Sequence, residues 1–171
     1  MSPRNRSEQI QRLDPAIAWP LEIPEVGTIS GKRFAGAYNL STGQVRVSCH
    51  DYGLSYANVG MESTGYLVTL HELGHKCSPN QPDWTQLSDM GRMLSVYTPK
   101  DRLLIVLAEI DAWQWAVDHS LTPIGADDVY MICQVCLGSY FGNTPAHVMR
   151  RKIVRDKYQQ LVTTLERRQL V

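Results

Sequence analysis

The sequence His-Glu-Leu-Gly-His at residues 71–75 constrains the fold more tightly than any other part of the chain. Histidines four residues apart lie on one face of a helix, so His71 and His75 can bind a single metal ion if this stretch is helical. A catalytic zinc site has three protein ligands and an open fourth position, so a third ligand must come from elsewhere. Glu72 has the chemistry of a general base toward a water molecule. The motif therefore predicts a helix that meets a second element carrying the third ligand.

A long helix is expected at residues 99–119, and it carries the leading candidate for that ligand. Thr98 is a typical N-cap, Pro99 suits the first helical position, and Asp101 places an acidic group in the first turn. Apolar residues cover most of the circumference, so this helix should be buried. A buried carboxylate such as that of Glu109 is unfavourable unless it is paired or bound to a metal. We therefore interpret Glu109 as the third ligand, with an ion pair to a buried arginine or capping of a backbone group as the alternative.

Small residues indicate that the two helices pack closely. Gly74 is a poor helix former, and close approach of a second helix explains its presence. Ala112 and Ala116 share a face with Glu109, and their small side chains allow that approach. Asp111 points about 200° away from Glu109 around the helix. We expect Asp111 either to orient a ligand histidine by hydrogen bonding or to lie in solvent.

Residues 33–40 and 44–50 are predicted to be the two strands of a hairpin around a Ser-Thr-Gly turn. Val45 and Val47 alternate with polar residues, which favours burial of one face of the second strand. The edge of such a hairpin could pair with an extended substrate. The expected fold class is therefore α+β: a short antiparallel sheet packed on the two helices, followed by two further helices.

The chain of 171 residues is expected to form a single domain. Its first 30 residues, in which three prolines are closely spaced, are interpreted as an extended and partly disordered N-terminal arm. Residues 33–120 form the expected core, with a first helix capped by Ser63 or Thr64 and ending near Cys77. An irregular loop at 78–97 connects it to the second helix. Residues 126–169 form the expected C-terminal extension, with helices at about 126–140 and from a cap at 143 or 144 to about 168.

Composition favours a cytoplasmic protein. Hydrophobic residues make up 43% and charged residues 20%, as in ordinary soluble domains, and no apolar run is long enough for a membrane span. The polar, basic N-terminus does not have the pattern of a secretory signal. The four cysteines are too few and too scattered for a disulfide framework. The Cys133-x-x-Cys136 pair is interpreted as buried thiols on an apolar helix.

Charge is unevenly distributed although the net charge is zero. Residues 47–149 carry four basic and eleven acidic groups, whereas residues 150–171 carry seven basic and two acidic groups. We interpret the contrast as neutralisation within the molecule, with self-association, an acidic partner or a nucleic acid as the less favoured alternatives.

Two stretches carry a family resemblance. Thr-Leu-His-Glu-Leu-Gly-His at 69–75, followed by Glu-Ile-Asp-Ala-Trp-Gln-Trp-Ala at 109–116, resembles the ImmA/IrrE-type zinc metallopeptidases of bacteria, phages and mobile elements. Those proteins pair a His-Glu-Leu-Gly-His helix with a later Glu-x-Glu-Ala-x-x-Phe-Ala helix, so Asp111 and Trp115 are mild departures. The resemblance covers roughly residues 33–120 and implies a zincin-like minimal metallopeptidase domain. The antirestriction ArdC-type domain has a similar first motif and would bring a DNA context.

The resemblance implies that His71, His75 and Glu109 bind Zn²⁺ and that Glu72 is the general base of a metalloendopeptidase. The expected substrate is a protein or peptide such as a repressor, in the host cytoplasm if the protein is phage-encoded. A neutral donor should stabilise the oxyanion, and spacing does not choose among the candidates Tyr140, His147, His119, His50 and Tyr52. The alternative is a non-proteolytic zinc-binding regulatory or DNA-associated protein. Iron, manganese or cobalt would also suit two histidines and a carboxylate.

Overall fold

The computed structural model describes residues 36–38, 45–47, 61–120 and 125–169. Within these ranges the chain forms two short strands and a series of helices that are joined by brief connections. In chain order the elements are β1 (Gly36–Tyr38), β2 (Val45–Val47), α2 (Met61–Cys77), the 3-10 helix η1 (Trp84–Gln86), α3 (Asp89–Leu94), α4 (Pro99–His119), α5 (Ala126–Gly142), α6 (Ala146–Met149) and α7 (Lys152–Gln169).

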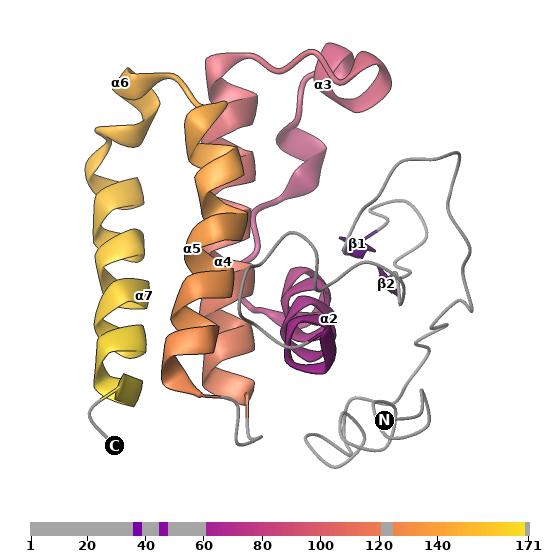
Figure 1. Ribbon diagram of the computed structural model, residues 1–171. Helices are drawn as coiled ribbons and strands as arrows, with labels where there is room; N and C mark the ends of the chain where they lie inside the picture. Colours follow the sequence, from indigo (N-terminus) through magenta and orange to yellow (C-terminus); the bar gives the residue numbers. More distant parts are fainter. Residues whose placement is uncertain (1–35, 39–44, 48–60, 121–124, 170–171) are drawn as a thin grey trace.

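Helix α4 is the central element of the fold. It packs against α2 on one side and against α5 and α7 on another. Figure 1 shows α4, α5 and α7 side by side with similar axis directions, whereas α2 crosses them and is seen almost end-on. In the described part of the chain, no helix combines the length and apolar character needed to cross a membrane.

The hydrophobic core lies between these four long helices. Trp113 at the middle of α4 is completely buried, and it is surrounded by leucine, isoleucine and valine side chains of the neighbouring helices. The buried residues of the main core cluster come from α2, α4, α5 and α7, and Met149 of α6 packs against it. Burial around most of the circumference of α4 agrees with its apolar sequence, since a helix that is hydrophobic on nearly all sides belongs in the interior.

The expected α+β class is wrong, because the described part of the chain is almost entirely helical. Extended structure there amounts to β1 and β2, three residues each, which pair antiparallel with Ala37 opposite Arg46. The pair lies beside α2, away from the other helices (Figure 1). Two such short strands do not form a layer, so the core is built by helix packed on helix. The remainder of the predicted hairpin and the N-terminal arm lie outside the described residues.

The helix ends predicted from capping residues agree with the structure for some helices and not for others. Helix α4 spans the predicted range, and Thr98 and Asp101 form a reciprocal capping box at its start. Helix α2 ends at Cys77 as expected but begins at Met61, ahead of the predicted caps. Helix α5 runs to Gly142, two residues beyond its predicted end. The sequence predicted a single helix at the C-terminus, but the structure has two, α6 and α7, which are separated at 150–151.

The connection between α2 and α4 is more ordered in structure than its sequence indicated. It contains η1 and α3, and the Asp101 carboxylate anchors it to the start of α4. This carboxylate accepts hydrogen bonds from the backbone N–H and hydroxyl of Ser88, at 2.8 and 2.7 Å. It also accepts from the backbone N–H and hydroxyl of Thr98. One buried side chain therefore joins the N-caps of two helices, α3 and α4.

Candidate metal centre

The side chains of His71, His75 and Glu109 meet where α2 crosses α4. The Nε2 atoms of His71 and His75 are 3.2 Å apart. Glu109 Oε2 lies 3.2 Å from His71 Nε2, and Glu109 Oε1 lies 3.4 Å from His75 Nε2. The three residues form a group that could hold a metal ion. This convergence has two causes. Helix periodicity places both histidines on one face of α2. Glu109 is buried in α4 at the point where the two helices cross.

These separations fit a small ion with tetrahedral coordination. A zinc ion bound at about 2.0–2.1 Å by tetrahedral ligands keeps its ligand atoms about 3.3 Å apart. The two Nε2 atoms are 3.2 Å apart, and each lies 3.2 or 3.4 Å from a different oxygen of Glu109. With one ligand atom taken from each residue, the three atoms lie within 4.8 Å of one another. Three ligand atoms leave one tetrahedral position for water or substrate, which is the arrangement of catalytic rather than structural zinc sites. Geometry alone does not identify the metal as zinc, because other divalent ions accept the same ligands.

Burial and the charges of neighbouring side chains change the pKa values of the three residues. Burial raises the pKa of Glu109, but hydrogen bonding and charge interaction with His71 and His75 outweigh it and lower the pKa to about 2. Burial lowers the pKa of His71 despite its contact with Glu109. The pKa of His75 is raised, because interactions with Glu109, Glu72 and Gln81 exceed the opposing effect of burial. The cluster thus combines an ionised carboxylate with at least one neutral imidazole, as metal binding requires.

Glu72 lies beside this group and is not one of its three ligands. Its side chain is buried, and the residue directly follows His71 in α2. Burial raises the pKa of Glu72 to about 8, with the charge of His75 lowering it and that of Glu109 raising it. A carboxyl group with this pKa can hold or release a proton near neutral pH. A divalent cation next to it would favour the ionised form.

The predicted close approach at Gly74 is confirmed. A Cβ atom built on Gly74 would lie 2.5 Å from the carbonyl oxygen of Ala112 and 2.8 Å from its Cα. Helices α2 and α4 therefore meet backbone to backbone one residue before His75 and three residues after Glu109. This contact limits the distance between the two helices that carry the candidate ligands.

Three residues that the sequence did not connect with the site lie near the histidine rings. Gln81 contacts His75, with its Oε1 3.2 Å from Nδ1 of the ring. The indole of Trp113 stacks on the His71 ring, with centroids 4.5 Å apart and planes inclined by 25°. Trp84 lies at the edge of His75, with ring centroids 6.5 Å apart. Two of these residues belong to the connection at 78–97, so this segment covers the His75 side of the site.

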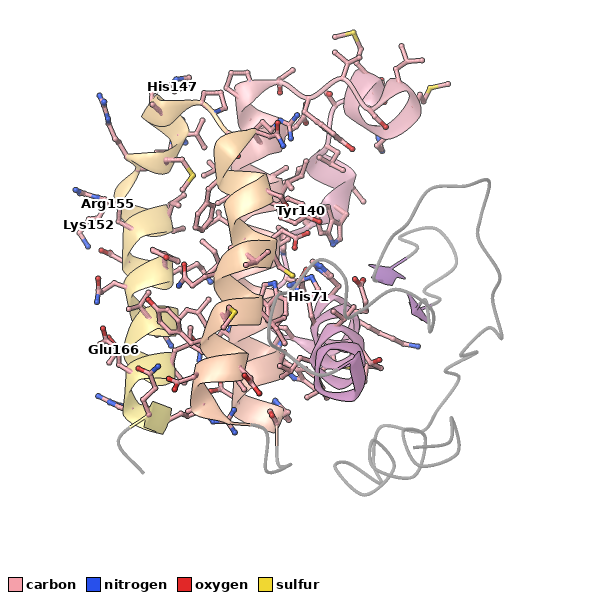
Figure 2. The ribbon with its side chains drawn as sticks, in the orientation of Figure 1. His71, Tyr140, His147, Lys152, Arg155 and Glu166 are labelled. Atoms are coloured by element: carbon pink, nitrogen blue, oxygen red, sulfur yellow. The ribbon has the colours of Figure 1, made fainter. Side chains whose placement is uncertain are left out.

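Tyr140 is the oxyanion-donor candidate that the structure brings to the metal centre. It lies on α5 and, as Figure 2 shows, on the side facing α2 and His71. Burial raises the pKa of its hydroxyl, and the charges of Glu109 and Glu72 together with a hydrogen bond to Glu109 raise it further. Tyr140 therefore keeps its proton at neutral pH and can act as a hydrogen-bond donor.

Two of the other donor candidates, His147 and His119, lie away from this group. His147 is exposed on α6 at the far end of the bundle from His71 (Figure 2). His119 lies at the end of α4, where its ring stacks on Trp115 and its Nδ1 is 2.8 Å from the Trp115 carbonyl oxygen. His50 and Tyr52 lie outside the described residues.

Asp111 interacts with α7 and not with a ligand histidine in the described structure. Its Oδ1 accepts a hydrogen bond from Lys157 Nζ at 2.6 Å, and its carboxylate is buried. Burial raises the pKa of Asp111, and Lys157 partly offsets this effect. The position two residues beyond Glu109 explains the outcome, because it turns the side chain to the opposite side of α4. The role of orienting a histidine therefore has no supporting contact.

Cys133 is completely buried on α5, and burial raises the pKa of its thiol. A thiol in such surroundings stays protonated and unreactive at neutral pH. The interpretation as a buried thiol is therefore confirmed for Cys133, whereas Cys136 is only partly buried.

Comparisons of the chain with protein-family models, with curated proteins and with solved structures found no match. The resemblance to ImmA/IrrE-type metallopeptidases therefore depends on the two motifs at 69–75 and 109–116. What the structure adds independently is a buried group of two histidines and one glutamate with the spacing of metal ligands.

Proposed function

We propose that this chain is a zinc-dependent metalloendopeptidase in which His71, His75 and Glu109 hold the metal and Glu72 is the general base. The observation that carries the proposal is the convergence of one ligand atom each from His71, His75 and Glu109 within 4.8 Å of one another. A second carboxylate, that of Glu72, is buried beside them. A site that only stabilises a fold has no need of Glu72. Zinc is the proposed ion because it is the metal that a His-Glu-x-x-His helix typically binds.

In this proposal, side chains around the metal take part in peptide hydrolysis. When bound, zinc supplies Lewis acidity, which lowers the pKa of water from 15.7 to about 7 and polarises a carbonyl group. The Glu72 carboxylate accepts a proton from the attacking water and delivers it to the leaving amine nitrogen. The Tyr140 hydroxyl donates a hydrogen bond to the substrate carbonyl oxygen as negative charge develops on it. Trp113 and Gln81 hold the two imidazole rings in place.

The identity of the substrate comes from the family resemblance. We propose a protein or peptide substrate, such as a repressor, and a cytoplasmic site of action. Nucleic acid is not needed for the chemistry of this centre.

A non-proteolytic zinc protein is the alternative function. The basic side chains Lys152 and Arg155 are exposed on α7 and point away from the bundle, on the side opposite α2 (Figure 2). In this alternative they would contact DNA, and the metal group would stabilise the arrangement of α2 and α4. Binding to DNA phosphates would then weaken steeply with increasing salt.

The deciding experiment compares wild type with Glu72→Gln. Zinc content is measured by elemental mass spectrometry, and cleavage is measured on a library of quenched fluorescent peptides. We expect about one zinc per chain in both proteins, and cleavage reduced by roughly 10²- to 10⁴-fold in the variant. Cleavage that survives the substitution, or wild-type protein without bound metal, would overturn the proposal. Zinc binding with no cleavage by wild type, together with salt-sensitive DNA binding, would favour the alternative.

A further inference from the structure

The side chain of Gln81 bridges the two helices that carry the proposed ligands. Its Oε1 lies 3.2 Å from His75 Nδ1 on α2, and its Nε2 donates a hydrogen bond of 2.9 Å to the Ala108 carbonyl oxygen on α4. Ala108 directly precedes Glu109. We propose that Gln81 is a positioning residue that fixes the tautomer of His75, so that Nε2 presents its lone pair to the metal. This inference rests on the metal-binding part of the proposed function.

The direction of the bridge follows from hydrogen-bond chemistry. A backbone carbonyl only accepts, so the NH₂ group of Gln81 must face Ala108. The amide oxygen then faces His75, and an amide oxygen also only accepts. The His75 Nδ1 atom must therefore carry the ring proton. In a neutral imidazole this leaves Nε2 without a proton, 3.2 Å from His71 Nε2 and 3.4 Å from Glu109 Oε1. The hydrogen bond from His75 to the Glu109 carboxylate then belongs to the doubly protonated ring, which loses its Nε2 proton when it binds a metal.

The two histidines are thus held in different ways. The His71 ring is stacked on Trp113, and its buried Nδ1 has no hydrogen-bond partner within the described part of the chain. Stacking fixes the plane of a ring but does not choose between its tautomers. The His75 tautomer is chosen by an amide that α4 itself orients through Ala108. A polar partner on the outer nitrogen of a ligand histidine typically changes metal affinity by about 10- to 100-fold.

A neutral amide suits this position better than a carboxylate. A carboxylate at residue 81 could accept from His75 but would place its second oxygen against the carbonyl oxygen of Ala108. It would also add a negative charge to a group that already contains Glu109. Gln81→Glu therefore keeps the acceptor for His75 and loses the bridge, whereas Gln81→Met removes both polar contacts at nearly constant size.

The first test reads the tautomer directly in metal-free protein. Histidine ring nitrogens are labelled with ¹⁵N, and long-range ¹H–¹⁵N correlation spectra identify the protonated nitrogen of His75 at a pH where the ring is neutral. We expect protonation at Nδ1 in wild type and in Gln81→Glu, and a mixture of tautomers in Gln81→Met. Unchanged protonation at Nδ1 in Gln81→Met would overturn the inference, whether or not the protein is a peptidase.

The second test measures zinc affinity by competition with a chromophoric chelator. We expect affinity to fall about 10- to 100-fold in Gln81→Met and to recover in large part in Gln81→Glu. Gln86→Met, an exposed substitution in the same segment, is the matched control and should bind as wild type does. Equal affinity of Gln81→Met and wild type would refute the positioning role and leave the proposed function standing. Wild type that binds no zinc would instead refute the proposed function, and the tautomer measurement would still decide the role of Gln81.

Discussion

Gly74 lies against the backbone of Ala112 so closely that a methyl group on it would be 2.5 Å from the Ala112 carbonyl oxygen. The neighbouring atoms are backbone and cannot rotate away, so Gly74→Ala must push α2 and α4 apart. Overpacking of this kind costs about 1–3 kcal/mol, which exceeds the roughly 1 kcal/mol that alanine contributes through helix propensity. We expect a lower free energy of unfolding, measured by urea denaturation, and weaker zinc binding, because the histidines move away from Glu109.

The matched control for this prediction is Gly138→Ala on α5. A Cβ atom at Gly138 meets nothing within 4 Å among the described residues. Only the propensity effect then remains, and we expect stabilisation by up to about 1 kcal/mol with unchanged zinc affinity. If Gly74→Ala behaved like Gly138→Ala, the close contact with Ala112 would not set the helix separation.

Features that depend on neighbouring residues in the chain, or on the size or charge of a single residue in a helix, were predictable from sequence. The α4 capping box at Thr98 follows from side chains that bond the backbone three residues away. The common face of His71 and His75 follows from helix periodicity. The meeting of Gly74 with Ala112 could be anticipated because small residues permit close helix packing. Glu109 could be singled out because a carboxylate in a buried helix needs a partner.

Features that depend on tertiary contacts were not predictable in the same way. Gln81 stands in a polar loop, and no spacing rule connects it to His75 and Ala108. The break between α6 and α7 occurs at Arg150 and Arg151, where the sequence contains neither proline nor glycine. The fold class was mistaken because alternating valines indicate extended structure without indicating how many residues will pair. In the described structure only three residues of each strand do so.

Asp101 should make the protein sensitive to acid. Hydrogen bonds from Ser88 and Thr98 outweigh the opposing effect of burial and hold the pKa of its carboxyl group well below the usual value. A group with a lowered folded-state pKa stabilises the fold above its unfolded pKa, near 3.9, and this stabilisation is lost as pH falls through the folded-state value. We expect the free energy of unfolding of metal-free wild type to drop below about pH 4 more steeply than that of Asp101→Asn.

Comparing these two proteins isolates Asp101, because Glu109 and the other carboxyl groups titrate in both. Urea denaturation at pH 7 and pH 3, with a chelator present, provides the measurement. The stability difference should be largest at pH 7 and should shrink at pH 3. A difference that stays constant with pH would mean that the charge of Asp101 does not hold α3 to α4.

Lys157 should contribute to stability but not to metal binding. Its ammonium group pairs with the buried Asp111 carboxylate, which faces away from Glu109. Lys157→Met leaves a buried acceptor without its donor, which costs about 1–3 kcal/mol. Lys152→Met removes an exposed pair with Asp156 and should cost at most about 0.5 kcal/mol. Thermal denaturation should separate the two variants while zinc affinity stays equal. A loss of zinc affinity in Lys157→Met would restore Asp111 as a residue that orients a ligand histidine.

Tyr140 and His147 were equivalent oxyanion-donor candidates in the sequence, and their positions now separate them. The Tyr140 hydroxyl interacts with Glu109 and stays protonated, whereas His147 is exposed at the far end of the bundle. Removing one oxyanion donor typically lowers kcat by about 10²- to 10³-fold. We expect a loss of that size in Tyr140→Phe with normal zinc content and melting temperature, and wild-type turnover in His147→Ala. Full activity in Tyr140→Phe would assign the donor to another residue, while a parallel loss of zinc would show that Tyr140 supports Glu109 and not the substrate.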